Sequence, residues 1–289
     1  MAITLVAVGF EHPPITTSDA RATEANITRV TTAFLEHSQF AHHPFDNELA
    51  GKFLDRYLDA LDPAHILFLQ SDADEFDAYR DGLARATRRT GDTQPAHVIF
   101  DRYLERLGER AAYVTNALQT AKFDFTGHEV YSYDRENAPH PRDLAAAQAL
   151  WIQQLGAEYL QEKLSDKKPA EIVKTLTRRY AQLSRTMGEM SRDEVLEVYL
   201  NALAHVYDPH SDYLGHEQMD SFSIAMNLSL FGIGATLQGE DGYCKIRELV
   251  PGGPAAHSGL LKPGDRIVAV AQDSQEPVDV VNMPLSHAV

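Results

Sequence analysis

The chain has 289 residues, of which 44% are hydrophobic and 24% charged, a composition typical of globular proteins and a length that allows two domains. Its net charge of -16, with no block of basic residues, argues against nucleic acid or an anionic membrane as a partner. The single cysteine, Cys244, excludes an internal disulfide bond.

The N-terminal segment 2–10, "AITLVAVGF", is apolar and uncharged, and polar sequence follows from Glu11. It is too short to span a bilayer. Two interpretations stay open at this point. The segment is either the tail of a secretory signal whose basic beginning is missing, or an apolar terminus that is frayed or buried.

Helical periodicity dominates the sequence from about Ser18 to His205. Three apolar stripes recur at helical spacing, and we interpret them as core rather than as cofactor sites, because any helical bundle needs such stripes. The first holds Leu49, Phe53, Tyr57 and Leu61; the second Phe100, Leu104, Leu107, Ala111, Val114 and Leu118; the third Ile172, Leu176, Tyr180, Leu183, Met187 and Met190.

Helix boundaries are also visible in this region. Residues 191–194, "SRDE", have the form of a capping box and predict the start of a fourth helix that runs toward Leu203. Segments 88–95 and 135–143 are rich in proline, glycine and small polar residues, so we expect breaks between helices there.

After Met226 the pattern changes from helix to strand. Alternating residues in 233–238 predict one strand, and segments 243–250 and 264–271 predict two more. Residues 251–265, between the last two, are expected to hold a short helix bracketed by glycines. The sequence therefore predicts an α+β protein with a mostly helical N-terminal domain and a small β-rich domain after it.

The densest cluster of possible zinc ligands lies in "DPHSDYLGH", with Asp208, His210, Asp212 and His216. The chain contains neither the H-E-x-x-H nor the C-x-x-C spacing of common zinc sites. An Asp-Pro turn, in which side chains bond to the nearby backbone, explains these residues better. We therefore predict a turn here and no metal site.

Ser211 lies between a histidine and an aspartate in the same segment. A catalytic triad is a spatial arrangement, so sequence neighbours do not establish one. The chain also has no G-x-S-x-G nucleophile elbow. The residues themselves predict no catalytic group.

The stretch "NLSLFGIGATLQ", residues 227–238, carries two glycines around Ile233. Glycines let successive backbone N–H groups turn toward one point, where they form a nest that binds a peptide carboxylate, and the next strand then pairs with that peptide. The alternative is a bulge or tight turn that enters the strand. The glycines by themselves favour the turn.

Two resemblances change that balance. The segment "PGGPAAHSGLLKPGDRIVAV" resembles the central part of a PDZ domain, and Phe231, Gly232 and Ile233 resemble the apolar-Gly-apolar part of the PDZ carboxylate-binding loop. The resemblance implies a peptide-carboxylate site formed by Leu230, Phe231, Gly232, Ile233 and Gly234. Leu230 departs from the pattern, because many PDZ domains have a glycine there.

Longer stretches resemble the tail-specific, or carboxyl-terminal processing, proteases. They are "LDPAHILFLQSDADEF" at 61–76, and "DEVLEVYLNALAHVYDPHSDYL" at 193–214 with its continuation to "VDVVNMPLSHAV". Together with the helical stripes they cover nearly the whole chain. This resemblance implies a possible signal remnant at 1–17, a helical N-terminal domain at 18–221 and an incomplete PDZ-like domain at 222–289, in which "MPLSHAV" begins the second wall of the peptide groove.

The family resemblance implies a serine protease of the periplasm or cell envelope. Its PDZ domain captures the C-terminal tails of protein substrates, and a separate domain cuts them with a serine and a lysine. Neither of those two motifs has a counterpart here, so we expect a fragment that is inactive alone and has no cofactor. The alternatives are a non-enzymatic adaptor that binds protein C-termini and, more distantly, a metal-dependent hydrolase using 208–216. The substrate, the oligomeric state and any accessory partner are not encoded in a recognisable way.

Overall fold

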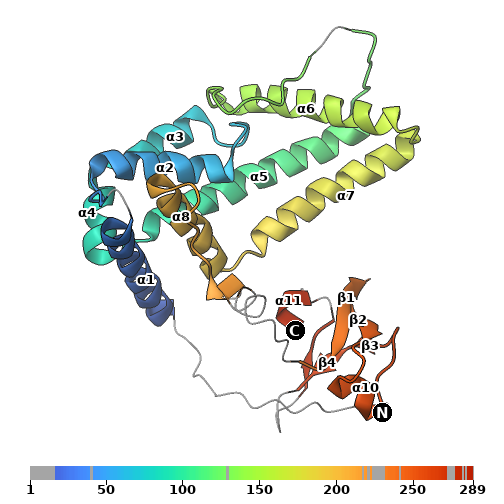
Figure 1. The fold of residues 1–289 in the computed structure, drawn as a ribbon. Helices are drawn as coiled ribbons and strands as arrows, with labels where there is room; N and C mark the ends of the chain where they lie inside the picture. The colour runs from blue at the N-terminus through green and yellow to red at the C-terminus, as the bar shows by residue number, and fades with distance from the viewer. Residues whose placement is uncertain are drawn as a thin grey trace. The chain divides into compact units, whose positions relative to one another are not determined.

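The computed structural model describes residues 17–39, 42–127, 130–216, 218–219, 222, 232–240, 242–271, 277–281, 283 and 285–288. These residues belong to two compact units, one within Thr16–His216 and the other within Glu217–Val289. The first is helical and the second contains the strands (Figure 1). The predicted α+β class is therefore confirmed. The predicted signal remnant lies almost entirely outside the described residues.

The first unit is built from helices joined by short turns and one long connection. Their bounds are α1 Thr17–Ser38, α2 Asn47–Leu61, α3 Gln70–Asp77, α4 Arg80–Thr90, α5 Gln94–Thr120, α6 Leu144–Leu164, α7 Pro169–Gly188 and α8 Arg192–Tyr207.

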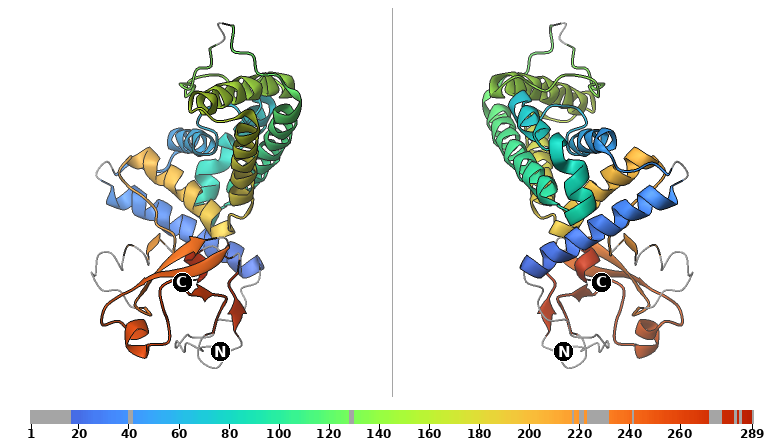
Figure 2. Two further views of the ribbon diagram at one scale, coloured as in Figure 1. Left: turned by 90° about the vertical axis from the view of Figure 1, so that its right-hand side faces the viewer. Right: turned by 90° about the vertical axis from the view of Figure 1, so that its left-hand side faces the viewer.

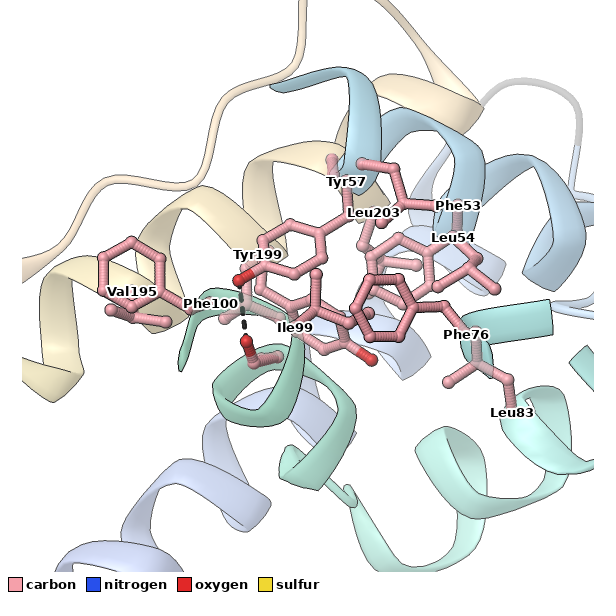
Figure 3. Packing of buried hydrophobic residues seen from close by; sticks show 14 of the residues in the cluster. Phe53, Leu54, Tyr57, Phe76, Leu83, Ile99, Phe100, Val195, Tyr199 and Leu203 are labelled. Atoms are coloured by element: carbon pink, nitrogen blue, oxygen red, sulfur yellow. Dashed lines mark hydrogen bonds between the residues drawn. The ribbon is translucent and has the colours of Figure 1, made fainter. Parts of the chain in front are cut away.

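The larger core of this unit lies where α2, α4 and α8 pack together with the N-terminal half of α5. Phe53 and Tyr57 of α2 lie on Tyr199 of α8, with ring centroids 4.5 and 4.9 Å apart (Figure 3). The Tyr57 hydroxyl donates to the carbonyl of Ala96 at 2.9 Å, so this buried polar atom is satisfied. The first predicted stripe is thus core, although Leu61 at its end is only partly buried.

A second core lies between α5, α6 and α7, of which α5 and α7 run side by side and α6 packs against both (Figures 1 and 2). Trp151 of α6 is fully buried there, and its indole Nε1 donates to the carbonyl of Ile66 at 2.7 Å. That bond ties the three-helix group to the turn that follows α2. The second predicted stripe is confirmed on α5, where Phe100, Leu107, Val114 and Leu118 are buried.

The third stripe is confirmed only in its first half. Ile172, Leu176 and Tyr180 of α7 are buried, whereas Leu183 is 38% exposed. The helix ends at Gly188, so Met190 lies beyond it. The first half of the stripe packs in the second core, whereas Met187 and Met190 are partly buried and pack against the larger core.

Two predicted boundaries differ in outcome. The Ser191 capping box is confirmed, because the Ser191 hydroxyl accepts from the Glu194 N–H and the Glu194 carboxylate accepts from the Ser191 N–H. The break predicted at 88–95 is too wide, since α4 continues to Thr90. Gly91 ends it with a left-handed φ of 64°, a conformation that glycine adopts without strain.

The segment 61–76 folds around two buried carboxylates. Asp62 accepts hydrogen bonds from the N–H groups of Ile66, Leu67 and Phe68 at 2.8–3.0 Å. Asp72 accepts from the Leu69 N–H at 2.9 Å and is paired with arginines of α5. The acidic residues of this segment therefore satisfy a turn that α2 and α3 could not close by themselves.

The second unit contains a three-stranded antiparallel sheet in the order β1–β2–β3 and a separate two-stranded pair, β4–β5. The bounds are β1 Ala235–Glu240, β2 Tyr243–Leu249, β3 Arg266–Ile267, β4 Ala269–Val270 and β5 Val278–Asp279, with short helices α10 Pro254–Ser258 and α11 Leu285–Ala288.

The first two predicted strands and the glycine-bracketed helix are confirmed in this unit. The strand predicted at 264–271 is wrong as a single element. The chain leaves the first sheet after Ile267 and joins β5 from Ala269, so the segment serves two sheets. In the described part of this unit the buried apolar side chains are those of Cys244, Ile246, Ala255, Ala271 and Val280.

Candidate peptide-binding site

The predicted carboxylate-binding segment lies at the entry to β1. Leu230 and Phe231 fall outside the described residues, so the structure places only Gly232, Ile233 and Gly234 of the five predicted site residues. Ile233 and Gly234 are partly buried and Gly232 is exposed. The structure therefore describes the second half of the loop, where it turns into the strand.

Two carbonyl groups anchor this half of the loop. The carbonyl of Ile233 accepts from the N–H of Ala255 at 2.7 Å, and the carbonyl of Gly234 accepts from the N–H of Val250 at 2.8 Å. The Ala255 N–H belongs to the first turn of α10, where helical N–H groups lack an intrahelical acceptor. Ile233 thus caps α10, and α10 in turn fixes the loop.

The N–H groups at the start of this half of the loop do not anchor it. Among the residues that the structure describes, neither the Gly232 nor the Ile233 N–H donates a hydrogen bond. A backbone anion nest requires neighbouring N–H groups that have no other acceptor. The role of these residues in carboxylate binding stays a prediction.

The two glycines differ in their backbone. Gly234 has a φ of 73°, and a Cβ added there would lie 2.9 Å from the Cα of Gly253. Gly232 has no positive φ, and a Cβ there would meet none of the described atoms within 4 Å. The residue that needs the left-handed region is therefore Gly234, where two chain segments approach closely.

The loop opens onto a strand edge. In the described residues β1 pairs with β2 on one side only, in a register that runs from Ala235 opposite Leu249 to Glu240 opposite Tyr243. The short helix α11 packs beside β1. An unpaired edge next to a helix is the geometry in which an added peptide strand finds both backbone partners and side-chain contacts.

Charged side chains on the neighbouring strands are already engaged. Lys245 donates to the Glu240 carboxylate at 2.6 Å, and this hydrogen bond lowers the pKa of Glu240 below its ordinary value. Arg266 stacks over the Tyr243 ring at 4.8 Å. Burial raises the pKa of the Cys244 thiol, so less of the nucleophilic thiolate forms. Cys244 is therefore a core residue rather than a nucleophile.

The 208–216 segment forms the predicted turn. The Asp208 carboxylate accepts from the His210 N–H at 3.1 Å and the Ser211 hydroxyl at 3.0 Å, and these two bonds lower its pKa. Asp212 instead accepts from His205 of α8 at 2.8 Å. Within the described ranges, no group of three or more His, Cys, Asp or Glu side chains is arranged to hold a metal ion.

Ser211 has no activating base in this turn. Its hydroxyl donates to Asp208 and accepts from the side-chain amide of Gln39 at 2.8 Å. Those bonds hold the hydroxyl in place rather than remove its proton, so it has no activated nucleophile character. None of the helices that the structure describes is long and apolar enough to cross a membrane.

Both regions of the chain match families of known proteins. Residues 31–217 match the model of the tail specific protease N-terminal domain, and residues 221–289 match that of the PDZ domain. The first match alone covers more than half of the chain. The chain belongs to the tail-specific protease family. The predicted resemblance is thereby confirmed, both for the helical region and for the PDZ-like region.

Individual relatives agree with this assignment. Over 286 residues, the chain is 36% identical to a tail-specific protease of Haemophilus influenzae, a match that covers 99% of the chain and 40% of the relative. It is also 37% identical over 73 residues to the carboxy-terminal processing protease CtpA of Bacillus subtilis, covering 25% of the chain and 16% of that protein. The chain thus spans less than half the length of these tail-specific protease relatives.

The sequence did not predict which residues hold the carboxylate-binding loop in place. Gly253 and Ala255 hold Gly234 and Ile233 through a close backbone contact and a hydrogen bond. The "PGGPAA" stretch signalled a PDZ-like helix, but nothing in it indicated which residues of the loop it contacts. That pairing arises only when segments twenty residues apart meet in space.

Proposed function

We propose that this chain is the substrate-recognising part of a tail-specific protease and that its PDZ domain captures the free C-termini of proteins. The observation that carries the proposal is the loop at Gly232 and Ile233, whose N–H groups donate no hydrogen bond among the described residues. The loop lies next to the edge of β1 that pairs with no described strand. The family assignment and the PDZ match support the same function.

In this proposal the peptide carboxylate accepts from the loop N–H groups, and the last residues of the peptide pair with β1 as an added strand. The flanking side chains of Leu230, Phe231 and Ile233 are apolar, which favours an apolar residue at the end of the peptide. Cleavage itself belongs to a region for which this chain offers no residues, and its 36% identity with a protease favours this function over a free-standing adaptor.

Calorimetric titration with one apolar-tailed peptide, in free-acid and amidated forms, tests the carboxylate site. We expect amidation to weaken binding by about 1.5–3 kcal/mol, the scale of hydrogen bonds to a charged group. A matched peptide with a polar last residue controls for the apolar contribution. Equal affinity for the acid and the amide would mean that the loop is only a turn.

We also propose that the protein works in the cell envelope. The apolar segment 2–10 and the resemblance to envelope proteases support this location. Fusion of the gene's N-terminal coding region to a reporter that is active only after export provides the test. A reporter that stays inactive while the fusion accumulates would contradict the proposal.

A further inference from the structure

The helical unit contains a cleft with basic walls, far along the chain from the peptide-binding loop. It lies between α1, α4 and the start of α2 and has a volume of about 640 Å³. Arg29 of α1 and Arg85, Arg88 and Arg89 of α4 line it. This clustering stands out because the whole chain carries a net charge of -16.

The carboxylates of the cleft neutralise only one of these four arginines, Arg88. Glu36 is engaged by the Arg88 guanidinium at 2.9 Å and by the Phe45 N–H at 2.7 Å. Asp46 caps α2 by accepting from the N–H groups of its first turn at 3.0 Å. The other three guanidinium groups of the cleft are not paired with these carboxylates.

Those three groups belong to Arg29, Arg85 and Arg89, which are exposed and form no ion pair within the part of the chain that the structure describes. Each guanidinium has five donors in a planar fork that matches a carboxylate. An exposed arginine without a partner is common by itself. Three that share one cleft produce a local positive potential that attracts an anionic ligand.

The floor of the cleft decides the size and character of the ligand. Phe45 and Ala84 are buried and Ala33 is exposed along it, so apolar atoms lie between the arginine walls. A single small anion would fill little of this volume and would leave the rest of the cleft to water. A long polyanion such as nucleic acid is disfavoured by the negative charge of the remaining surface.

We propose that this cleft binds an acidic peptide segment of a protein partner, in which carboxylate side chains alternate with apolar ones. The carboxylates pair with Arg29, Arg85 and Arg89, and the apolar side chains pack against exposed Ala33 and the aliphatic stems of the arginines. The site is independent of the PDZ loop, because it recognises side-chain carboxylates rather than a free C-terminus.

The test measures fluorescence anisotropy of a short labelled peptide of alternating Glu and Leu, titrated with the whole chain. The peptide is blocked at both ends, so the PDZ site does not contribute. We expect binding that weakens as salt is added, since screening reduces the attraction between exposed charges. The Arg85→Ala/Arg89→Ala variant should bind about tenfold more weakly or worse, because it loses two charge-assisted contacts.

A double variant of two exposed arginines outside the cleft, Arg56→Ala/Arg178→Ala, is the matched control and should bind like the unmodified chain. The Arg85→Lys/Arg89→Lys variant should recover part of the affinity, because charge returns without the planar fork. Circular dichroism of each variant checks that the helices are intact.

Several results would overturn the proposal. They are no binding of the Glu-Leu peptide, equal binding of its Gln-Leu counterpart, or equal weakening in the control double variant. Displacement of the peptide by inorganic phosphate at comparable concentration would indicate a site for small anions. Tighter binding of a single-stranded oligonucleotide would indicate a nucleic-acid site.

Discussion

At the scale of single residues, Gly232 and Gly234 look alike in sequence but have different roles. Gly234 combines a left-handed φ of 73° with backbone contact to Gly253, whereas Gly232 has room for a side chain. Glycine at 234 is therefore needed for the fold of the PDZ-like unit. Glycine at 232 is free to serve the ligand.

We expect Gly234→Ala to destabilise the β-rich unit by at least about 1–2 kcal/mol, the cost of placing a Cβ in the left-handed region. The close contact with Gly253 adds to that cost. Urea unfolding measures the change, and Gly232→Ala is the matched control with an expected loss below about 1 kcal/mol. A Gly232→Ala loss as large as that of Gly234→Ala would contradict this assignment.

His65 is a second residue whose chemistry follows from its partners. Its Nδ1 faces the carbonyl of Ala138 at 2.6 Å and its Nε2 faces the Asp59 carboxylate at 3.0 Å. Both partners are acceptors, so these contacts favour the imidazolium, in which both ring nitrogens donate. Burial by itself would lower the pKa of His65, but these bonds outweigh it and raise the pKa above 6.5.

This shift predicts a pH dependence with a definite sign. Because the folded-state pKa is raised, the contribution of His65 is fully present below pH 6.5 and is lost as the pH rises through the folded value. His140, which stacks on His65 with ring centroids 4.4 Å apart, has its pKa lowered by burial and by the His65 charge. The effect of His140 is opposite, because its contribution to stability is lost as the pH falls below 6.5, the ordinary pKa of histidine.

Thermal unfolding between pH 5 and 9 separates the two effects. In His65→Asn we expect the loss of stability above pH 6.5 to disappear. In His140→Asn the high-pH loss should persist. Identical pH profiles for the His65 variant and the unmodified chain would show that this imidazolium does not hold the 135–143 connection.

At the scale of elements, a buried carboxylate of α1 contacts both α5 and α8. Glu24 is 2% exposed and accepts from Arg192 of α8 through both oxygens at 2.9 and 3.0 Å. It also accepts from Thr93 and faces His97 of α5. Burial would raise the pKa of Glu24, but these bonds lower it, so α1, α5 and α8 share one charged junction.

We expect Glu24→Ala to destabilise the helical unit by about 3 kcal/mol, the lower end of what breaking a buried ion pair costs. The lower end applies because Arg192 is 40% exposed and regains water. Lys52→Ala is the control, since its pair with Glu48 is exposed on both sides and should be worth less than about 1 kcal/mol. Equal losses in the two variants would contradict a special role for Glu24.

At the scale of the whole molecule, the two units have separate cores of different size. The helical unit buries two large clusters, while the β-rich unit buries mainly five small or medium side chains in its described part. A small core supports less stability. Separate cores also allow the units to unfold separately.

Calorimetry should accordingly show two unfolding transitions, with the β-rich unit melting first. Gly234→Ala should lower only the first transition, and Glu24→Ala only the second. A single cooperative transition that both variants shift equally would show that the units depend on each other for stability.

The amino-acid sequence determined much of this protein by itself. The stripes on α2 and α5, the Ser191 capping box and the 208–216 turn all depend on residues close in sequence, whose interactions are local. The family was also visible, because long ordered motifs survive in the linear sequence.

Tertiary structure alone decided the rest. Nothing local shows that Gly234 rather than Gly232 needs a positive φ, since the cause is the contact with Gly253. Likewise, the single strand predicted at 264–271 divides because its two halves find partners in different sheets. The arginines of the cleft come from α1 and α4, more than fifty residues apart in the sequence. They come close together only after the helices have packed.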